Sequence, residues 1–132
     1  MKGTIEVLQR RNIIGVLSGA PERVRQWSAA ESGERFIPSV EFQIGRDNIS
    51  PKALRQLFES GEFKVLGEIE NQYVGIAPDD DRMEPYWTLA EELDVPVAIH
   101  LGGGPPGAPY LGSPKMRIRH GADTRTDRQL SA

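Results

Sequence analysis

The stretch that decides the fold is Val65–His100, VLGEIENQYVGIAPDDDRMEPYWTLAEELDVPVAIH. It begins with the apolar run Val65–Ile69 and ends with a second apolar run, Val95–His100. Between the two, after a predicted N-cap at Asp81, apolar side chains recur at helical spacing and form one stripe: Met83, Tyr86, Trp87, Ala90 and Leu93. This spacing favours core packing over ligand contact for Trp87. A strand, an amphipathic helix and a further strand are typical of a β/α unit with parallel strands.

Further units of the same kind precede this stretch. The apolar runs Ile13–Leu17 and Phe36–Val40 have the length of buried strands, and the four predicted strands begin 23 to 31 residues apart, the period of a strand plus a crossover helix. Helical patterns occupy the intervals: Met1–Arg11, a helix from Pro21 that carries Val24 and Trp27, and a helix from Ser50-Pro51 through Leu54, Leu57 and Phe58 to Gly61. Pro38 lacks an amide hydrogen, which predicts a bulge or a sheet edge at that position.

Composition excludes several classes of protein. The 132 residues carry a net charge of −3, which argues against nucleic acid as the main partner, and the short basic stretch of Lys115, Arg117 and Arg119 is interpreted as a solvated patch. The absence of cysteine excludes thiolate catalysis, disulfides and cysteine-ligated zinc. No apolar run reaches the roughly 18 residues of a membrane helix, and the N-terminus lacks a signal pattern. We therefore expect a cytoplasmic protein without a membrane partner.

Ligands of parallel β/α proteins bind at the carboxyl ends of the strands, so polar residues there are candidates for a site. His100 ends the fourth predicted strand, and its imidazole suits a metal ligand, an acid–base group or a histidine bonded to a neighbouring carbonyl. Glu68 lies inside an apolar strand, where a buried carboxylate must be coordinated, hydrogen-bonded or paired with an Arg or Lys. Glu70 projects to the same side as Glu68 if the strand is regular. The earlier strand ends offer Ser18, Glu41 and Gln43, and the third strand is followed by Asn71, Gln72 and Tyr73.

The sequence changes character after His100. Gly102–Gly112 holds five glycines and three prolines, which predicts a loop. It matches neither phosphate-binding glycine pattern, so a mobile active-site loop is the better interpretation, and no G-x-S-x-G motif indicates a serine nucleophile. We expect one domain over residues 1–120 and a disordered polar tail over residues 121–132, which lack periodicity.

Several motifs, in matching order, resemble the amidohydrolase-related branch of the amidohydrolase superfamily. They are VLGEI at Val65–Ile69, the pair Gln72-Tyr73, EPYWTLAEEL at Glu84–Leu93, VPVAIH at Val95–His100 and GGPPGAPY at Gly103–Tyr110. The resemblance is dense from Val65 to Gly112 and looser from Ile13 to Glu62. It implies a TIM (β/α)₈ barrel whose strand ends hold one or two divalent metals, usually zinc. The metal activates water for attack on a C–N or C–O bond of a small-molecule substrate, or assists a decarboxylation.

Transferred by residue, the resemblance implies that His100 is the metal ligand at the end of the fifth barrel strand and that Glu68 is the fourth-strand carboxylate. Family members also carry a His-x-His pair on the first strand, which this chain lacks, and His120 lies in a region without a strand pattern. A full barrel takes about 250 residues, so we expect parallel β/α units forming about half of a barrel. With two strong ligands at most, the isolated chain is expected to be a catalytically inactive fragment.

A second interpretation stays open, a non-catalytic small-ligand-binding or assembly module with an open flavodoxin-like sheet. A divalent metal near Glu68 and His100 would distinguish the hydrolase from this module, and a third possibility is a folded fragment without an evolved function. An incomplete barrel leaves two sheet edges and an uncovered apolar interior. We therefore predict a homo-oligomer that associates through its exposed sheet edges.

Overall fold

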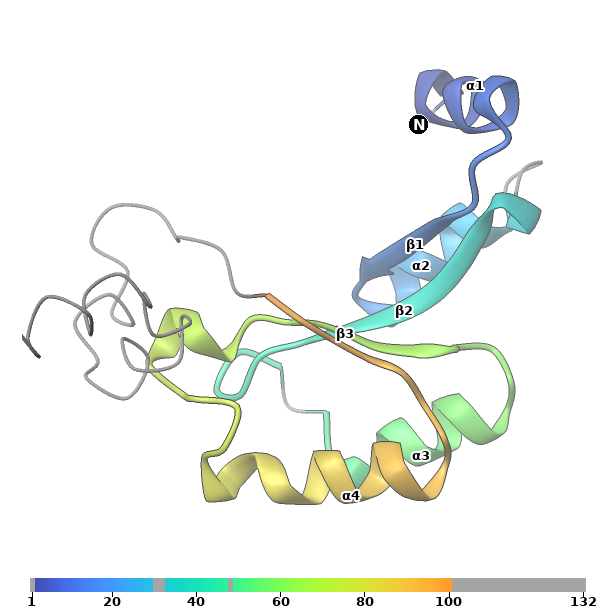
Figure 1. Ribbon diagram of the computed structural model, residues 1–132. Coiled ribbons are helices and arrows are strands. Elements are labelled where there is room, and N and C mark those ends of the chain that lie inside the picture. Colours follow the sequence, from blue (N-terminus) through green and yellow to red (C-terminus); the bar gives the residue numbers. More distant parts are fainter. Residues whose placement is uncertain (1, 30–32, 48, 101–132) are drawn as a thin grey trace, which may run out of the picture.

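The computed structural model describes residues 2–29, 33–47 and 49–100, in which helices and strands alternate along the chain (Figure 1). The α-helices are α1 (Lys2–Arg11), α2 (Pro21–Ser28), α3 (Pro51–Glu59) and α4 (Glu84–Glu92). The strands are β1 (Gly15–Gly19), β2 (Phe36–Phe42), β3 (Val65–Ile69) and β4 (Val97–Ile99). Three short 3₁₀ helices are η1 (Gly33–Arg35), η2 (Asn71–Val74) and η3 (Asp81–Met83).

The four strands form one parallel sheet in the order β1-β2-β3-β4, which confirms the predicted α/β class. β1 and β2 end two residues later than predicted, and β4 ends one residue earlier. β1 and β4 also start later than predicted, because helix ends reach into the apolar runs. The Ile13 amide donates to the Leu8 carbonyl at 2.9 Å, so β1 begins only at Gly15. The Val95 amide donates to the Ala90 carbonyl at 2.8 Å, so β4 is shorter than Val95–His100.

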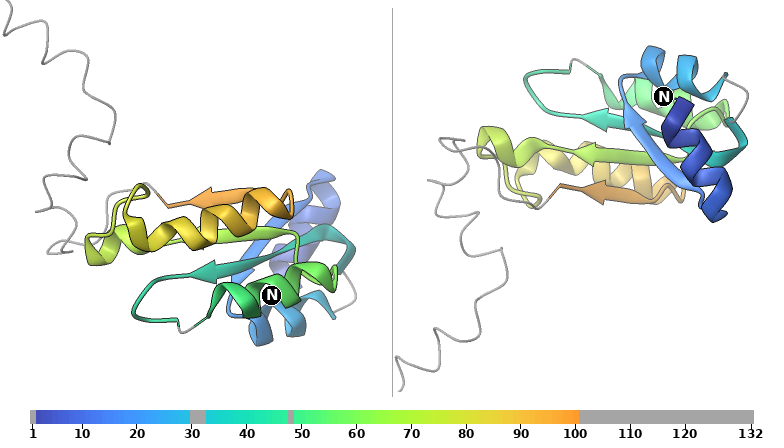
Figure 2. Two further views of the ribbon diagram at one scale, coloured as in Figure 1. Left: turned by 90° about the horizontal axis from the view of Figure 1, so that it is seen from below. Right: turned by 90° about the horizontal axis from the view of Figure 1, so that it is seen from above.

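One hydrophobic core lies on one face of the sheet. It joins buried residues of the strands to buried residues of α2, α3 and α4, namely Val40, Phe42, Leu66, Ile69, Val24, Leu54, Phe58, Leu89 and Ala90. Figure 2 shows α3 and α4 together on one side of the sheet, with α1 on the other side. The opposite face of the strands keeps apolar side chains in solvent, since Val16 is 57% exposed and its neighbour Ile37 is 37% exposed.

The helix boundaries follow from local signals in the sequence. Ser50 caps α3 as predicted, because its hydroxyl accepts a hydrogen bond from the Ala53 amide and Pro51 opens the helix. The predicted cap of α4 at Asp81 is wrong: Asp80 accepts from the Arg82 amide and caps η3, and α4 follows from Glu84. Trp87 packs against the core as predicted, and its indole nitrogen donates to the Pro78 carbonyl at 2.7 Å.

Pro38 occupies an interior strand, so the predicted bulge or edge at this residue is wrong. Its pairing with Leu17 of β1 is regular, and the register shift between β2 and β3 lies further on, between Val40 and Phe42. The Pro38 carbonyl accepts from the Lys64 amide at 2.9 Å, just before β3 begins. Because the amide and carbonyl of one strand residue point to the same side, the proline nitrogen faces a position that β3 has not yet reached. The sheet therefore loses no ladder bond.

Several predicted features lie outside the described residues. They are the glycine-rich loop Gly102–Gly112, the basic stretch of Lys115, Arg117 and Arg119, His120, and the tail of residues 121–132 with its domain boundary. Among the residues that are described, no helix is both long and apolar enough to cross a membrane.

Candidate functional site

Glu68 and His100 meet at the carboxyl ends of the neighbouring strands β3 and β4. His100 directly follows β4, and its backbone amide donates to the Ile69 carbonyl at 2.9 Å, which continues the parallel ladder by one residue. The Glu68 carboxylate contacts the Nδ1 atom of the His100 ring. The two predicted site residues are therefore side by side at one rim of the sheet.

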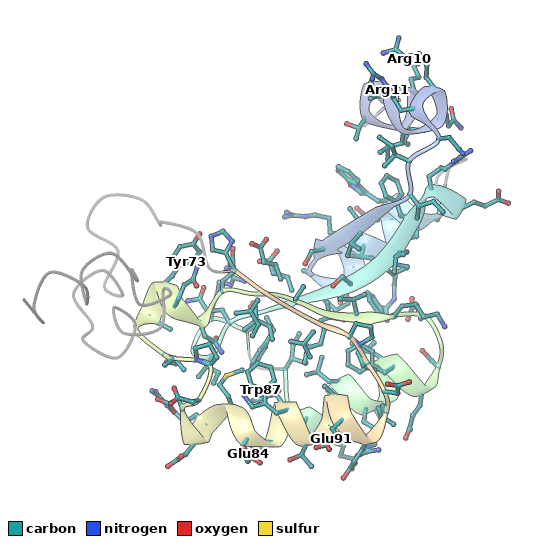
Figure 3. All side chains as sticks on the ribbon, in the orientation of Figure 1. Arg10, Arg11, Tyr73, Glu84, Trp87 and Glu91 are labelled. Atoms are coloured by element: carbon teal, nitrogen blue, oxygen red, sulfur yellow. The ribbon has the colours of Figure 1, made fainter. Side chains whose placement is uncertain are left out.

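Tyr73, a polar residue that follows the third predicted strand, is a third member of this group. It lies on η2, the single turn that follows β3, and its hydroxyl is 2.8 Å from the Nε2 atom of His100. The centroids of the two rings are 5.2 Å apart, and Figure 3 shows Tyr73 at this end of the molecule. A carboxylate, an imidazole and a phenol thus form a row, and both ring nitrogens of His100 contact a side chain.

The expectation that Glu68 is a buried carboxylate is wrong. Its side chain is 44% exposed, and that of His100 is 27% exposed. The pairing of β3 with β4 is irregular between Leu66 and Ile69, and this irregular part of the strand leaves Glu68 partly open to solvent. Its side-chain partner is His100, and not the Arg or Lys that was one of the alternatives. An exposed rim position is accessible to a ligand.

Glu70 belongs to a separate cluster. It was expected to project to the same side as Glu68 if the strand is regular, but the pairing of β3 is irregular between Leu66 and Ile69 and the strand ends before Glu70. Its carboxylate lies 2.7 Å from Arg46, which also bonds Glu41 at 2.5 Å and Asp47 at 2.9 Å. The hydrogen bond to Asp47, followed by that to Glu70, raises the pKa of the Arg46 guanidinium against the opposing effect of its partial burial. Arg46 therefore joins carboxylates from the ends of β2 and β3 in one cluster and offsets part of their negative charge. Gln43 contributes its backbone: its amide donates to the Asp47 carboxylate, and its carbonyl accepts from the amides of Arg46 and Asp47.

Ser18 and Ser39, on the two strands that precede β3, direct their hydroxyls toward β3. Ser18 of β1 and Ser39 of β2 are register partners, and both hydroxyls donate to the Gly67 carbonyl. Ser18 also accepts a hydrogen bond from the Glu68 amide. Ser18 therefore contacts the backbone of a candidate site residue directly.

The chemistry of Glu68 and His100 suits a divalent ion, because imidazole nitrogen and carboxylate oxygen are common zinc ligands. Within residues 2–29, 33–47 and 49–100, no group of three or more His, Cys, Asp or Glu residues could hold a metal ion. Coordination by both side chains requires one of them to turn, since His100 already contacts Glu68 and Tyr73. The residues fit an ion by type, and further ligands would come from solvent or from residues outside those ranges.

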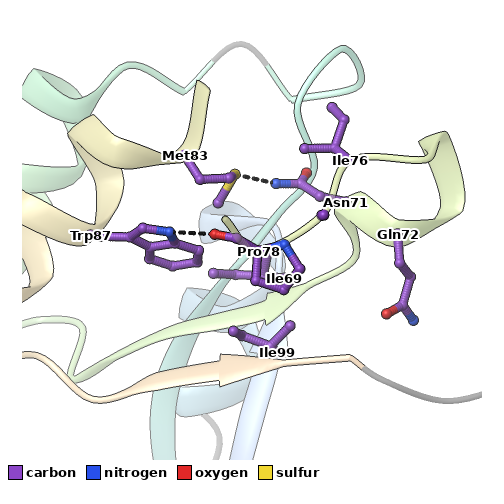
Figure 4. A pocket seen from close by; sticks show the side chains of 9 residues that line it. Ile69, Asn71, Gln72, Ile76, Pro78, Met83, Trp87 and Ile99 are labelled. Carbon is purple, nitrogen blue, oxygen red and sulfur yellow. Dashed lines mark hydrogen bonds between the residues drawn. The ribbon is translucent and has the colours of Figure 1, made fainter. Parts of the chain in front are cut away.

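A small cavity lies beneath this rim and is too small to be a ligand site (Figure 4). Its volume is about 10 Å³, at or below what one water molecule needs. Asn71 in its wall is already bonded, because it donates to the Met83 sulfur at 2.6 Å and accepts from the Ile44 amide at 2.6 Å. The cavity is a packing gap between η2 and α4, and a ligand of Glu68 and His100 would bind on the open rim.

Comparisons with protein-family models, with curated proteins and with solved structures found no match to this chain.

Proposed function

We propose that this chain is part of a metal-dependent hydrolase of the amidohydrolase-like type, with a divalent ion, zinc in the first instance, bound at the rim where Glu68 and His100 meet. The observation that supports it is the contact between these two side chains at the carboxyl ends of adjacent parallel strands. Ligand sites of β/α proteins form at this end. The substrate is a small molecule with a C–N or C–O bond to be hydrolysed, or a carboxylate to be removed. A cytoplasmic location is part of the same proposal.

The arrangement of layers supports a partial barrel. In a (β/α)₈ barrel the helices form an outer ring and the strand side chains of the other face fill the interior. Here α2, α3 and α4 share one core on one face of the sheet, while Val16 and Ile37 remain exposed on the other face. We infer that this exposed face corresponds to a barrel interior, with four of its eight strands present among the described residues.

In this proposal His100, Glu68 and Tyr73 have different roles at the rim. His100 would hold the ion through one ring nitrogen, and Glu68 would either share the ion or orient the imidazole through the other nitrogen, as carboxylates do in metal sites. Tyr73 would hold the ring through Nε2 if the ion bound at Nδ1, and an ion at Nε2 would displace the Tyr73 hydroxyl. When bound, the ion lowers the pKa of a coordinated water toward neutrality. Because catalytic zinc sites usually have three protein ligands, we expect the isolated chain to bind metal weakly and to turn over little or no substrate.

The first prediction concerns metal affinity. Titration calorimetry with Zn²⁺, and Co²⁺ absorption as a second readout, should detect a single weak site. His100→Ala should weaken Zn²⁺ binding about tenfold or more, since one of two ligands is lost, and Glu68→Gln should weaken it as well. Glu84→Gln is the matched control, because Glu84 is an exposed carboxylate on α4, away from the rim (Figure 3).

One result would contradict the metal site, and another would contradict the expected lack of turnover. Zn²⁺ affinity that is equal in the wild type, His100→Ala and Glu84→Gln would remove Glu68 and His100 from any metal site. Hydrolysis of amide or ester substrates by the isolated chain, abolished by His100→Ala, would place the metal site correctly but overturn the expected lack of turnover.

We also propose the assembly role as a second candidate, because both edge strands expose apolar side chains. Val16 of β1 is 57% exposed, and Val97 and Ile99 of β4 are each 38% exposed. An edge strand with exposed apolar residues is a template for pairing with another chain. The partner we infer is a second copy of this chain, joined edge to edge.

The second prediction concerns this association. Sedimentation of the wild type should show a species larger than the monomer that grows with concentration, and Val16→Lys should shift the population toward monomer, because a charge on an edge strand opposes pairing. Val7→Lys is the control, since Val7 is 45% exposed on α1 and lies off the sheet. A wild type that stays monomeric at high concentration would end the assembly proposal.

A further inference from the structure

The backbone of Gly67 and Glu68 lies outside the regular ladders of the sheet. Pairing of β3 with β2 is regular up to Leu66 and resumes at Ile69, and pairing with β4 follows the same two residues. The peptide groups between them therefore need partners other than the neighbouring strands. This gap lies directly beside the carboxylate that contacts His100.

Serine hydroxyls take the place of the missing ladder bonds. Ser18 reaches across from β1, 50 residues earlier in the chain, accepts from the Glu68 amide and donates to the Gly67 carbonyl. Ser39, which is fully buried on β2, donates to the Gly67 carbonyl and lies 3.1 Å from the Val65 carbonyl. Side chains from two strands thus fix the main chain at the one point where the sheet leaves it free.

The side chain of Glu68 gains little orientation from packing, because it is 44% exposed. His100 is held separately through its amide on the Ile69 carbonyl and through Tyr73 on Nε2. The direction of the Glu68 carboxylate thus depends on how its own backbone is held. The Glu68 amide is held by the Ser18 hydroxyl, to which it donates a hydrogen bond.

We infer that Ser18 is a positioning residue for the Glu68–His100 pair, with Ser39 supporting it from β2. The hydroxyl of Ser18 sets the Glu68 backbone so that the carboxylate meets Nδ1 of His100. The inference rests on the proposed function, because it names a residue on which that metal site would depend. The contact between Glu68 and His100 that it explains nevertheless exists without metal.

The metal-free test is an imidazole ¹H–¹⁵N spectrum of ¹⁵N-labelled protein, with the His100 signals assigned by His100→Ala. The wild type should show an Nδ1-bound proton protected from solvent exchange by Glu68. Ser18→Ala should expose that proton, with exchange about tenfold faster, while Ser18→Thr, which keeps the hydroxyl, should restore protection. Ser28→Ala on α2 is the control, since no described residue bonds its hydroxyl.

A second arm measures Zn²⁺ affinity in the same variants. Ser18→Ala should weaken it about tenfold, as loss of an outer partner of a metal ligand does, with Ser18→Thr near wild type. If the wild type binds no Zn²⁺ but the Nδ1 proton still responds to Ser18→Ala, the metal proposal fails and the positioning role stands. An Nδ1 proton equally protected in wild type and Ser18→Ala would overturn the inference. The inference would also be overturned if neither Ser18→Ala nor Ser18→Cys folded, because Ser18 would then be required for folding and not for positioning Glu68.

Discussion

Gly67→Ala should destabilise the protein by about 3 kcal/mol, the upper range for overpacking a close-packed site. A Cβ atom at this position would lie 2.5 Å from the carbonyl oxygen of Ala98 and 2.8 Å from its Cβ, and neither atom is the far end of a flexible side chain. The φ angle of Gly67 is +153°, which an L-residue rarely adopts. β4 would have to move away from β3, and His100 would move with it.

Urea unfolding of the wild type and Gly67→Ala gives the measurement, with Gly15→Ala as the matched control. Gly15 is also a strand glycine, at the start of β1, and a Cβ there would meet no atom within 4 Å. Its replacement should change the free energy of unfolding by no more than about 0.5 kcal/mol. Equal midpoints for the two variants would show that β3 and β4 do not approach each other this closely.

The fold could be predicted to the level of the parallel sheet because its signals are local. Apolar runs, helical spacing and the Ser50-Pro51 start each depend on a few consecutive residues, and the structure confirms four parallel strands in this order. The ends of elements were less predictable, because they depend on competition between a helix and the next strand. Val95 shows this, since its amide completes the end of α4 before β4 can begin.

The candidate site was predictable in part. Parallel strands bring their carboxyl ends to one edge, which was enough to place Glu68 beside His100. The exposure of Glu68 was not predictable, because it results from an irregularity of β3 that no local pattern encodes. Ser18 and Tyr73 were among the polar residues at the predicted strand ends, but their contacts were not predictable. Tyr73 reaches His100 from a 3₁₀ turn, and Ser18 bonds the Glu68 backbone from a strand 50 residues away.

Phe42→Ala should lower the free energy of unfolding by about 4 kcal/mol, typical of a buried phenylalanine and a large share of the 5–15 kcal/mol that stabilises most domains. Phe42 ends β2, is fully buried, and its ring centroid is 4.4 Å from that of Tyr86 on α4. Its backbone carbonyl also accepts from the Glu70 amide at 3.1 Å. The substitution would therefore open a cavity between the sheet and α4, directly below the rim.

Thermal or urea unfolding measures the loss, and Phe36→Ala is the control, since Phe36 begins the same strand but is only half-buried. A second readout is Tyr86, whose pKa is raised by burial. In Phe42→Ala, water reaching the cavity should stabilise the charged phenolate and bring that pKa down toward its ordinary value, whereas Phe36→Ala should leave it unchanged. Equal losses of stability in the two variants, with no change at Tyr86, would mean that α4 does not depend on Phe42 for its place on the sheet.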